Sequence, residues 1–149
     1  MLLRVGGVRA VPPYRPEMNA AHPVIRVYLV EDSPILIKLL VGLLEADAGV
    51  LVVGHADNAP DATPAILELR PDAVVLDLHL RTGNGIDVIR ALRETGNVPT
   101  CIVLTNHSGI PYRKAALEAG AHHFFDKSTE IPLMLAVIRT LSRGAKTPK

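Results

Sequence analysis

Residues 73–85 read AVVLDLHLRTGNG, an apolar run that ends on a single carboxylate, Asp77. Four consecutive apolar residues, two of them valine, predict a strand covered on both faces, because a half-exposed strand would alternate apolar and polar residues. The TGNG that follows predicts a loop soon after the aspartate. A charged side chain is therefore expected at the very end of a buried strand, where its presence needs a chemical reason.

Strands and helices alternate in both directions from this stretch. Strands are predicted over 24–30, 50–56, 73–77, 100–105 and 122–126. Helices are predicted within 33–49, 60–70, 86–95, 111–119 and 131–143. Ser33 and Pro34 suit the N-cap and first position of the first helix, whereas Pro64 leaves the start of the second helix open. Nearly continuous apolar strands alternating with helices predict an α/β fold, a doubly wound five-stranded parallel sheet with helices on both faces.

Length and composition favour one globular domain. The chain has 149 residues, of which 48% are hydrophobic, and its formal net charge is +1, so no strong basic field points to nucleic acid. Residues 1–23 contain four prolines and no periodic apolar pattern, which predicts a disordered or loosely packed extension. We therefore expect the domain over 24–143, with 144–149 as a short tail.

The single cysteine and the hydropathy pattern indicate the compartment. Cys101 lies in an apolar stretch, so it is interpreted as a small buried hydrophobic residue, and one cysteine excludes an internal disulfide. Neither a signal peptide nor a run long enough to span a membrane is present in the sequence. Together these features predict a cytoplasmic protein without membrane insertion.

Chemically active side chains follow four of the predicted strands. Because functional groups gather outside the carboxyl ends of parallel strands, these side chains are expected along one edge of the sheet. The set comprises three carboxylates, one hydroxyl and one ammonium: Glu31 and Asp32 after the first strand, Asp77 after the third, Thr105 after the fourth and Lys127 after the fifth.

Four motifs in combination resemble the response-regulator receiver domain of two-component and phosphorelay systems, over about residues 24–143. They are EDS at 31–33, LDLHLRTGNG at 76–85, LTNHS at 104–108 and FFDKS at 124–128. The resemblance implies the flavodoxin-like (βα)5 topology, one of the doubly wound arrangements. It also implies that Asp77 is the phospho-acceptor, Glu31 and Asp32 the acidic pair, Thr105 the switch hydroxyl and Lys127 the site lysine.

The residue types suit this chemistry without the family name. A carboxylate can attack phosphorus to form a mixed anhydride, and phosphoryl transfer needs mainly positioning and charge neutralisation. Crowded carboxylates repel by roughly 4 kcal/mol per pair at about 4 Å and an effective dielectric of about 20, and a hard cation removes that repulsion. We expect Mg²⁺, with Mn²⁺ able to substitute, on Glu31, Asp32 and Asp77. Family geometry adds the backbone carbonyl of His79.

Three further residues take expected roles from the resemblance. Phe124 stands at the position of the switch aromatic and lacks a hydroxyl to hold it outward. His79 and His107, each two residues past a site residue, are expected to tune the lifetime of the phosphoryl group. Arg81 stands where many receivers have proline, so a more basic and more mobile loop is expected after Asp77.

These observations predict a stand-alone, CheY-like response regulator that is a switch rather than an enzyme. It would take a phosphoryl group from a sensor histidine kinase or histidine phosphotransfer protein and alter a protein-binding surface, formed by about residues 111–143. No direct DNA binding is expected, and a dimer formed on phosphorylation stays open, as do the downstream target and process. The alternatives are a Mg²⁺-dependent phosphohydrolase acting through an aspartyl phosphate, a flavodoxin-like nucleotide module and a docking module that is never phosphorylated.

Overall fold

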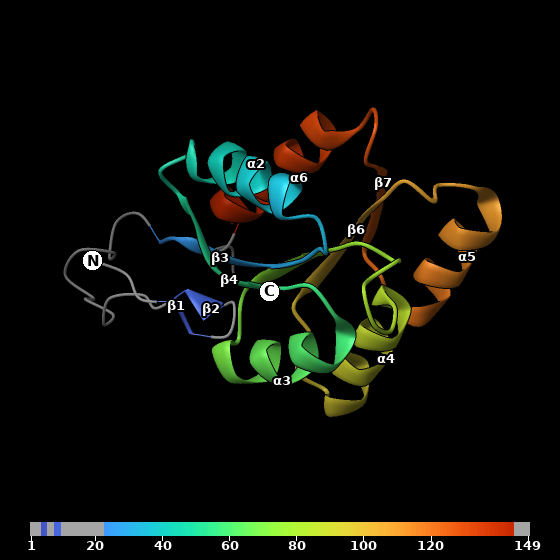
Figure 1. Ribbon diagram of the computed structural model, residues 1–149. Helices are drawn as coiled ribbons and strands as arrows, with labels where there is room; N and C mark the ends of the chain where they lie inside the picture. Colours follow the sequence, from blue (N-terminus) through green and yellow to red (C-terminus); the bar gives the residue numbers. More distant parts are fainter. Residues whose placement is uncertain (1–3, 6–7, 10–22, 145–149) are drawn as a thin grey trace.

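A computed structural model describes residues 4–5, 8–9 and 23–144 (Figure 1). The strands are β1 (Arg4–Val5), β2 (Val8–Arg9), β3 (Ile25–Val30), β4 (Val50–Ala56), β5 (Ala73–Leu76), β6 (Thr100–Thr105) and β7 (His123–Asp126). The helices are α2 (Pro34–Glu45), α3 (Ala59–Leu69), α4 (Gly85–Thr95), α5 (Ile110–Ala119) and α6 (Ile131–Gly144). The strand order is β1-β2-β4-β3-β5-β6-β7, and the pairs from β4 to β7 are parallel. The predicted doubly wound five-stranded parallel sheet is confirmed.

Local chemistry explains where the helices begin and end. The Ser33 hydroxyl accepts a hydrogen bond from the Leu36 amide at 3.2 Å and caps α2, with Pro34 at its first position as predicted. Helix α3 continues through Pro64; Asn58 caps its first turn, and Ala62 and Ile66 are buried in the apolar core. The unsettled start of the second helix is thereby placed at Ala59.

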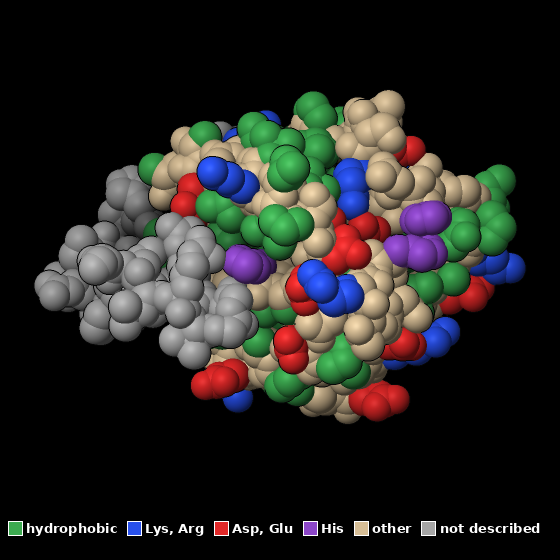
Figure 2. Space-filling view, in the orientation of Figure 1, with side chains coloured by type: hydrophobic (Ala, Val, Ile, Leu, Met, Phe, Trp, Pro, Cys, Tyr) green, Lys and Arg blue, Asp and Glu red, His purple; other side chains and the backbone are tan. Residues whose placement is uncertain are grey.

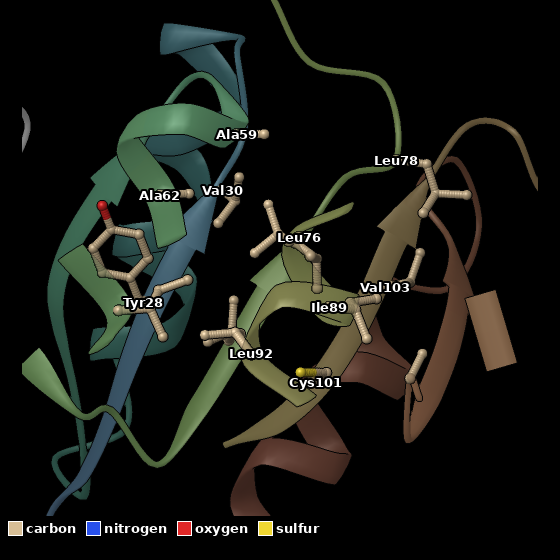
Figure 3. Packing of buried hydrophobic residues seen from close by; sticks show 14 of the residues in the cluster. Tyr28, Val30, Ala59, Ala62, Leu76, Leu78, Ile89, Leu92, Cys101 and Val103 are labelled. Carbon is tan, nitrogen blue, oxygen red and sulfur yellow. The ribbon is translucent and has the colours of Figure 1, made fainter. Parts of the chain in front are cut away.

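Two apolar layers lie on opposite faces of the sheet. Helices α2 and α6 cover one face, with Leu40, Leu44, Met134 and Ile138 buried among the strand residues. Helices α3, α4 and α5 cover the other face, where Tyr28, Leu76, Ile89, Leu92 and Cys101 pack together (Figure 3). Both faces of the central strands β3, β5 and β6 are thus largely buried, which explains their mostly apolar sequences.

The amino-terminal stretch contributes two short strands. Strands β1 and β2 pair antiparallel, and Val8 of β2 aligns with Gly54 of β4, so they extend the parallel sheet at its β4 edge. The other residues of the extension predicted over 1–23, apart from Pro23, and residues 145–149 of the predicted tail lie outside the described part of the chain. Within the described ranges no helix has the length and hydropathy needed to cross a bilayer.

Candidate functional site

The backbone hydrogen bonds between strands continue one residue past the strand ends and place the predicted site residues at one edge of the sheet. The Glu31 amide donates to Ala56 at 2.9 Å, the Asp77 amide to Val30 at 3.0 Å and the Lys127 amide to Thr105 at 2.8 Å. Glu31, Asp77 and Thr105 are all buried. The parallel register therefore aligns the carboxyl ends of β3, β5, β6 and β7, as the sequence predicts.

Lys127 joins the two buried carboxylates of this edge. Its Nζ lies 2.6 Å from Oδ2 of Asp77 and 3.0 Å from Oε1 of Glu31. The other oxygen of Glu31 accepts the Ser33 amide at 3.0 Å, and Oδ1 of Asp77 accepts the His79 amide at 3.4 Å. One ammonium therefore lies between two carboxylates, and all three side chains are shielded from solvent.

Burial and pairing compete in setting the charges of this cluster. Burial raises the pKa of Glu31 and outweighs the hydrogen bond from Lys127, which acts to lower it. Burial also acts to lower the pKa of Lys127, but the hydrogen bonds to Asp77 and Glu31 outweigh it, so the pKa of Lys127 is raised. The lysine is therefore held in its charged form, facing the predicted acceptor.

The site residues provide the type of oxygen ligand that a hard cation binds. Carboxylate and carbonyl oxygens are the ligands that Mg²⁺ takes, and Asp32, half-buried, follows Glu31 at the same edge. In the described ranges no three His, Cys, Asp or Glu side chains are close enough to form a ready-made metal site. The predicted ligand set thus stays a prediction: Glu31, Asp32, Asp77 and the His79 carbonyl. In this set Lys127 and the cation would bind the same carboxylates.

An aromatic cluster lies beside the acidic edge. The rings of His79 and His107 stack with centroids 3.6 Å apart, and the Tyr112 ring lies 5.9 Å from the first and 5.3 Å from the second. Figure 2 shows two histidine side chains side by side next to a group of acidic side chains. The His107 amide donates to Oγ1 of Thr105 at 3.1 Å. The two predicted rate-tuning residues are thus in contact with each other.

The loop after Asp77, for which Arg81 predicts a more basic and more mobile segment, makes several contacts with the rest of the domain. The guanidinium of Arg81 forms an ion pair with Asp57 at 3.0 Å, and the Ala59 amide donates to Thr82 at 2.9 Å. The loop closes where the Gly85 amide donates to Leu78 at 2.9 Å. A Cβ at Gly85 would collide with the Asp77 carbonyl oxygen, so only glycine allows this close approach.

Phe124 is buried, and Arg113, a residue that sequence reasoning missed, lies over it. The guanidinium carbon of Arg113 is 5.0 Å from the centre of the Phe124 ring, and Nη2 donates to the Phe124 carbonyl at 3.3 Å. Tyr112, also missed, neighbours Arg113 in α5. Neither residue lies at a strand end, and no motif in the sequence marked them.

Comparison with known proteins agrees with this geometry. The family model described as the response regulator receiver domain matches residues 27–139, which include every predicted site residue. A crystal structure of a two-component response regulator of the LuxR family from Aurantimonas sp. SI85-9A1 superposes with a TM-score of 0.75 at 31% identity, covering 81% of this chain and 86% of that one. The signal receiver domain of the putative response regulator NarL from Mycobacterium tuberculosis, at 24% identity, has the same fold with a TM-score of 0.76, covering 82% of this chain and 98% of that one.

Curated relatives are longer than the matched region. The chain is 33% identical over 122 residues to the uncharacterized transcriptional regulatory protein YvfU of Bacillus subtilis, covering 82% of this chain and 61% of that protein. It is 39% identical over 111 residues to a protein-glutamate methylesterase/protein-glutamine glutaminase of Nocardioides sp., covering 73% of this chain and 30% of that protein. The chain thus spans between about a third and three fifths of these relatives. The matched model, the fold and the four strand-end motifs place this chain in the response regulator receiver domain family.

Proposed function

We propose that Asp77 accepts a phosphoryl group from the phosphohistidine of a sensor histidine kinase or a histidine phosphotransfer protein. The observation that carries this is the Asp77 carboxylate, buried at the sheet edge with the Lys127 ammonium at 2.6 Å. A carboxylate oxygen attacks phosphorus, the bond from phosphorus to the donor imidazole breaks, and an acyl phosphate forms. In an already acidic pocket, the incoming charge has to be balanced by Lys127 and a divalent cation.

The residues around Asp77 divide the work of this transfer. Lys127 neutralises charge on the acyl and phosphoryl oxygens, while Thr105 carries a hydroxyl that can leave its bond to the His107 amide for a phosphoryl oxygen. Asp32, Glu31, Asp77 and the His79 carbonyl would hold Mg²⁺, which supplies Lewis-acid stabilisation when bound. Gly85 keeps the loop close against the Asp77 backbone.

The donor protein needs a surface next to Asp77, and α2 offers one. Ile35, Leu39 and Leu43 recur at four-residue spacing and are 83%, 49% and 38% exposed. Their helix begins two residues after Asp32, so a partner lying on this stripe could bring a phosphohistidine to the acidic edge. An apolar stripe of this spacing suits packing against another helix. We infer that the donor packs on Ile35, Leu39 and Leu43.

Labelling with radioactive acetyl phosphate tests the acceptor. The wild-type chain should take up acid-stable, base-labile label in Mg²⁺, whereas Asp77→Asn, Asp32→Ala and wild type in EDTA should not. Asp87→Asn, an exposed aspartate of α4, is the matched control and should label normally. Equal labelling of Asp77→Asn would refute the proposal. Repeated turnover of a phosphate ester would favour the phosphohydrolase, and no label at all the docking module.

Transfer from a protein donor tests the α2 stripe separately. Leu39→Asp should slow transfer from purified histidine kinases of the same genome by at least an order of magnitude, yet leave acetyl phosphate labelling unchanged. Ile110→Asp, an equally drastic change on exposed α5, should leave both unchanged. Unaltered kinase transfer to Leu39→Asp would exclude the stripe. That this receiver acts without an output domain stays a prediction, as does the absence of DNA binding.

A further inference from the structure

The guanidinium of Arg113 lies over Phe124, the residue at the position of the switch aromatic. Arg113 of α5 lies over the Phe124 ring at 5.0 Å and also hydrogen bonds the Phe124 carbonyl at 3.3 Å. The ring is only 4% exposed, whereas Arg113 is exposed at the surface. Because β7 is the last strand in the order, this bond is made to a strand with no neighbour on its outer side in the described part of the sheet. Arg113 thus contacts both the side chain and the backbone of the same residue.

Phe124 is buried while the Thr105 hydroxyl is hydrogen bonded to the backbone of its own loop. Oγ1 of Thr105 accepts the His107 amide at 3.1 Å, so the hydroxyl is held within its own loop. In the coupled switch expected from the sequence, drawing the hydroxyl to a phosphoryl group makes room for the ring, but a phenylalanine, which has no hydroxyl to hold it outward, also samples the inward position beforehand. The buried ring is therefore favoured by contacts that exist before phosphorylation, namely its packing in the apolar core and the contacts with Arg113.

We propose that Arg113 is a positioning residue that holds Phe124 in its buried position before phosphorylation. A guanidinium over a ring face is attracted by the ring quadrupole, and its hydrogen bond to the Phe124 carbonyl fixes where it lies. At an exposed site these contacts together shift the ratio of buried to displaced ring by about threefold to tenfold. Because phenylalanine has no hydroxyl to fix its ring by a hydrogen bond, Arg113 supplies that restraint.

The first turn of α5 is consequently linked to the site at two neighbouring residues. Tyr112 lies against the His79 and His107 rings, and Arg113 lies against Phe124. The role of these two contacts in phosphorylation rests on the proposed function. If the buried ring is the form that the phosphorylated site favours, removing Arg113 lowers the apparent affinity for a phosphoryl group in proportion to the buried fraction lost.

Fluorine NMR on the full chain tests the inference without any phosphoryl group. The sequence contains two phenylalanines, so labelling with 4-fluorophenylalanine gives two resonances, and Phe125→Leu assigns them. In Arg113→Ala the Phe124 resonance should move and gain a solvent isotope shift. Arg113→Lys keeps the charge but not the planar contact and should lie between. Lys114→Ala, which removes the neighbouring exposed cation, should match wild type.

Two results overturn the inference. One is an unchanged Phe124 resonance in an Arg113→Ala protein whose circular dichroism and melting show it to be folded. The other is an equal response of Lys114→Ala, which would make the effect one of net charge. A beryllofluoride titration with Mg²⁺ then measures the link to the site, where Arg113→Ala should bind about threefold more weakly. Failure of wild type to bind beryllofluoride would count against the proposed function alone, since the fluorine spectra need no phosphoryl mimic.

Discussion

Lys127 places its ammonium 2.6 Å from the carboxylate of Asp77, the predicted phospho-acceptor. The same ammonium lies 3.0 Å from Glu31, so the chain stores two buried negative charges around one positive charge. The three charged groups are therefore not equivalent, because the single ammonium compensates both carboxylates. Removal of a carboxylate leaves a neutral pair, whereas removal of the lysine leaves two uncompensated carboxylates.

We expect this asymmetry in the free energy of unfolding. Lys127→Ala should lower it by about 3 kcal/mol, because breaking a buried ion pair leaves charge without a partner. Asp77→Asn should change it by no more than about 1 kcal/mol, since Lys127 keeps Glu31. Urea denaturation at pH 7 measures both, with exposed Lys114→Ala as the control. Equal losses for Lys127→Ala and Asp77→Asn would contradict the arrangement.

Two glycines with opposite surroundings give a second prediction. A Cβ at Gly85 would collide with the Asp77 carbonyl, so Gly85→Ala should shift the acceptor loop, lower stability by about 2 kcal/mol and slow acetyl phosphate labelling. Gly42 lies inside α2 with open space around it, so Gly42→Ala should raise stability by about 0.5–1 kcal/mol and leave labelling unchanged. Thermal melts and labelling rates of the two variants test the contrast. A Gly85→Ala protein as stable and active as wild type would disprove it.

The sheet and the strand-end residues were predictable because both depend on the order of residues along the chain. Apolar runs fixed β3, β5 and β6, and a parallel sheet necessarily brings the residues after them to one edge. The contact of Arg113 with Phe124 was not predictable, because it depends on how α5 is rotated against β7. The stacking of His79 on His107 was not predictable either, because the sheet brings their loops to the same edge but no local pattern encodes how the two rings meet. The strands before residue 23 were missed because each is only two residues long.

The single thiol gives a third prediction. Cys101 is fully buried, and burial raises its pKa from an ordinary 9.0 to about 11. Native protein at pH 8 should therefore react with Ellman's reagent at least about a hundredfold more slowly than protein in urea. A group whose folded pKa is raised stabilises the fold below its unfolded pKa, so stability should fall as pH rises from about 9 to 11. Rapid native labelling would show that the strand β6 is not covered as described.

The histidine pair gives the last prediction, on the lifetime of the phosphoryl group. His79 and His107 stack at 3.6 Å beside the site, and each follows a site residue whose side chain accepts its amide hydrogen. If the stack limits the approach of water to the acyl phosphate, breaking it from either side opens the same path. His79→Ala and His107→Ala should each speed dephosphorylation by about threefold to tenfold, the effect of lowering the barrier by roughly 0.7–1.4 kcal/mol. The double variant should be no faster than either single one, because the rings act as one unit.

Tyr112→Phe preserves the ring contacts and should decay like wild type. Decay of labelled protein after removal of acetyl phosphate measures the rates of wild type and the four variants, and multiplicative effects of the two alanines would show that the rings act separately.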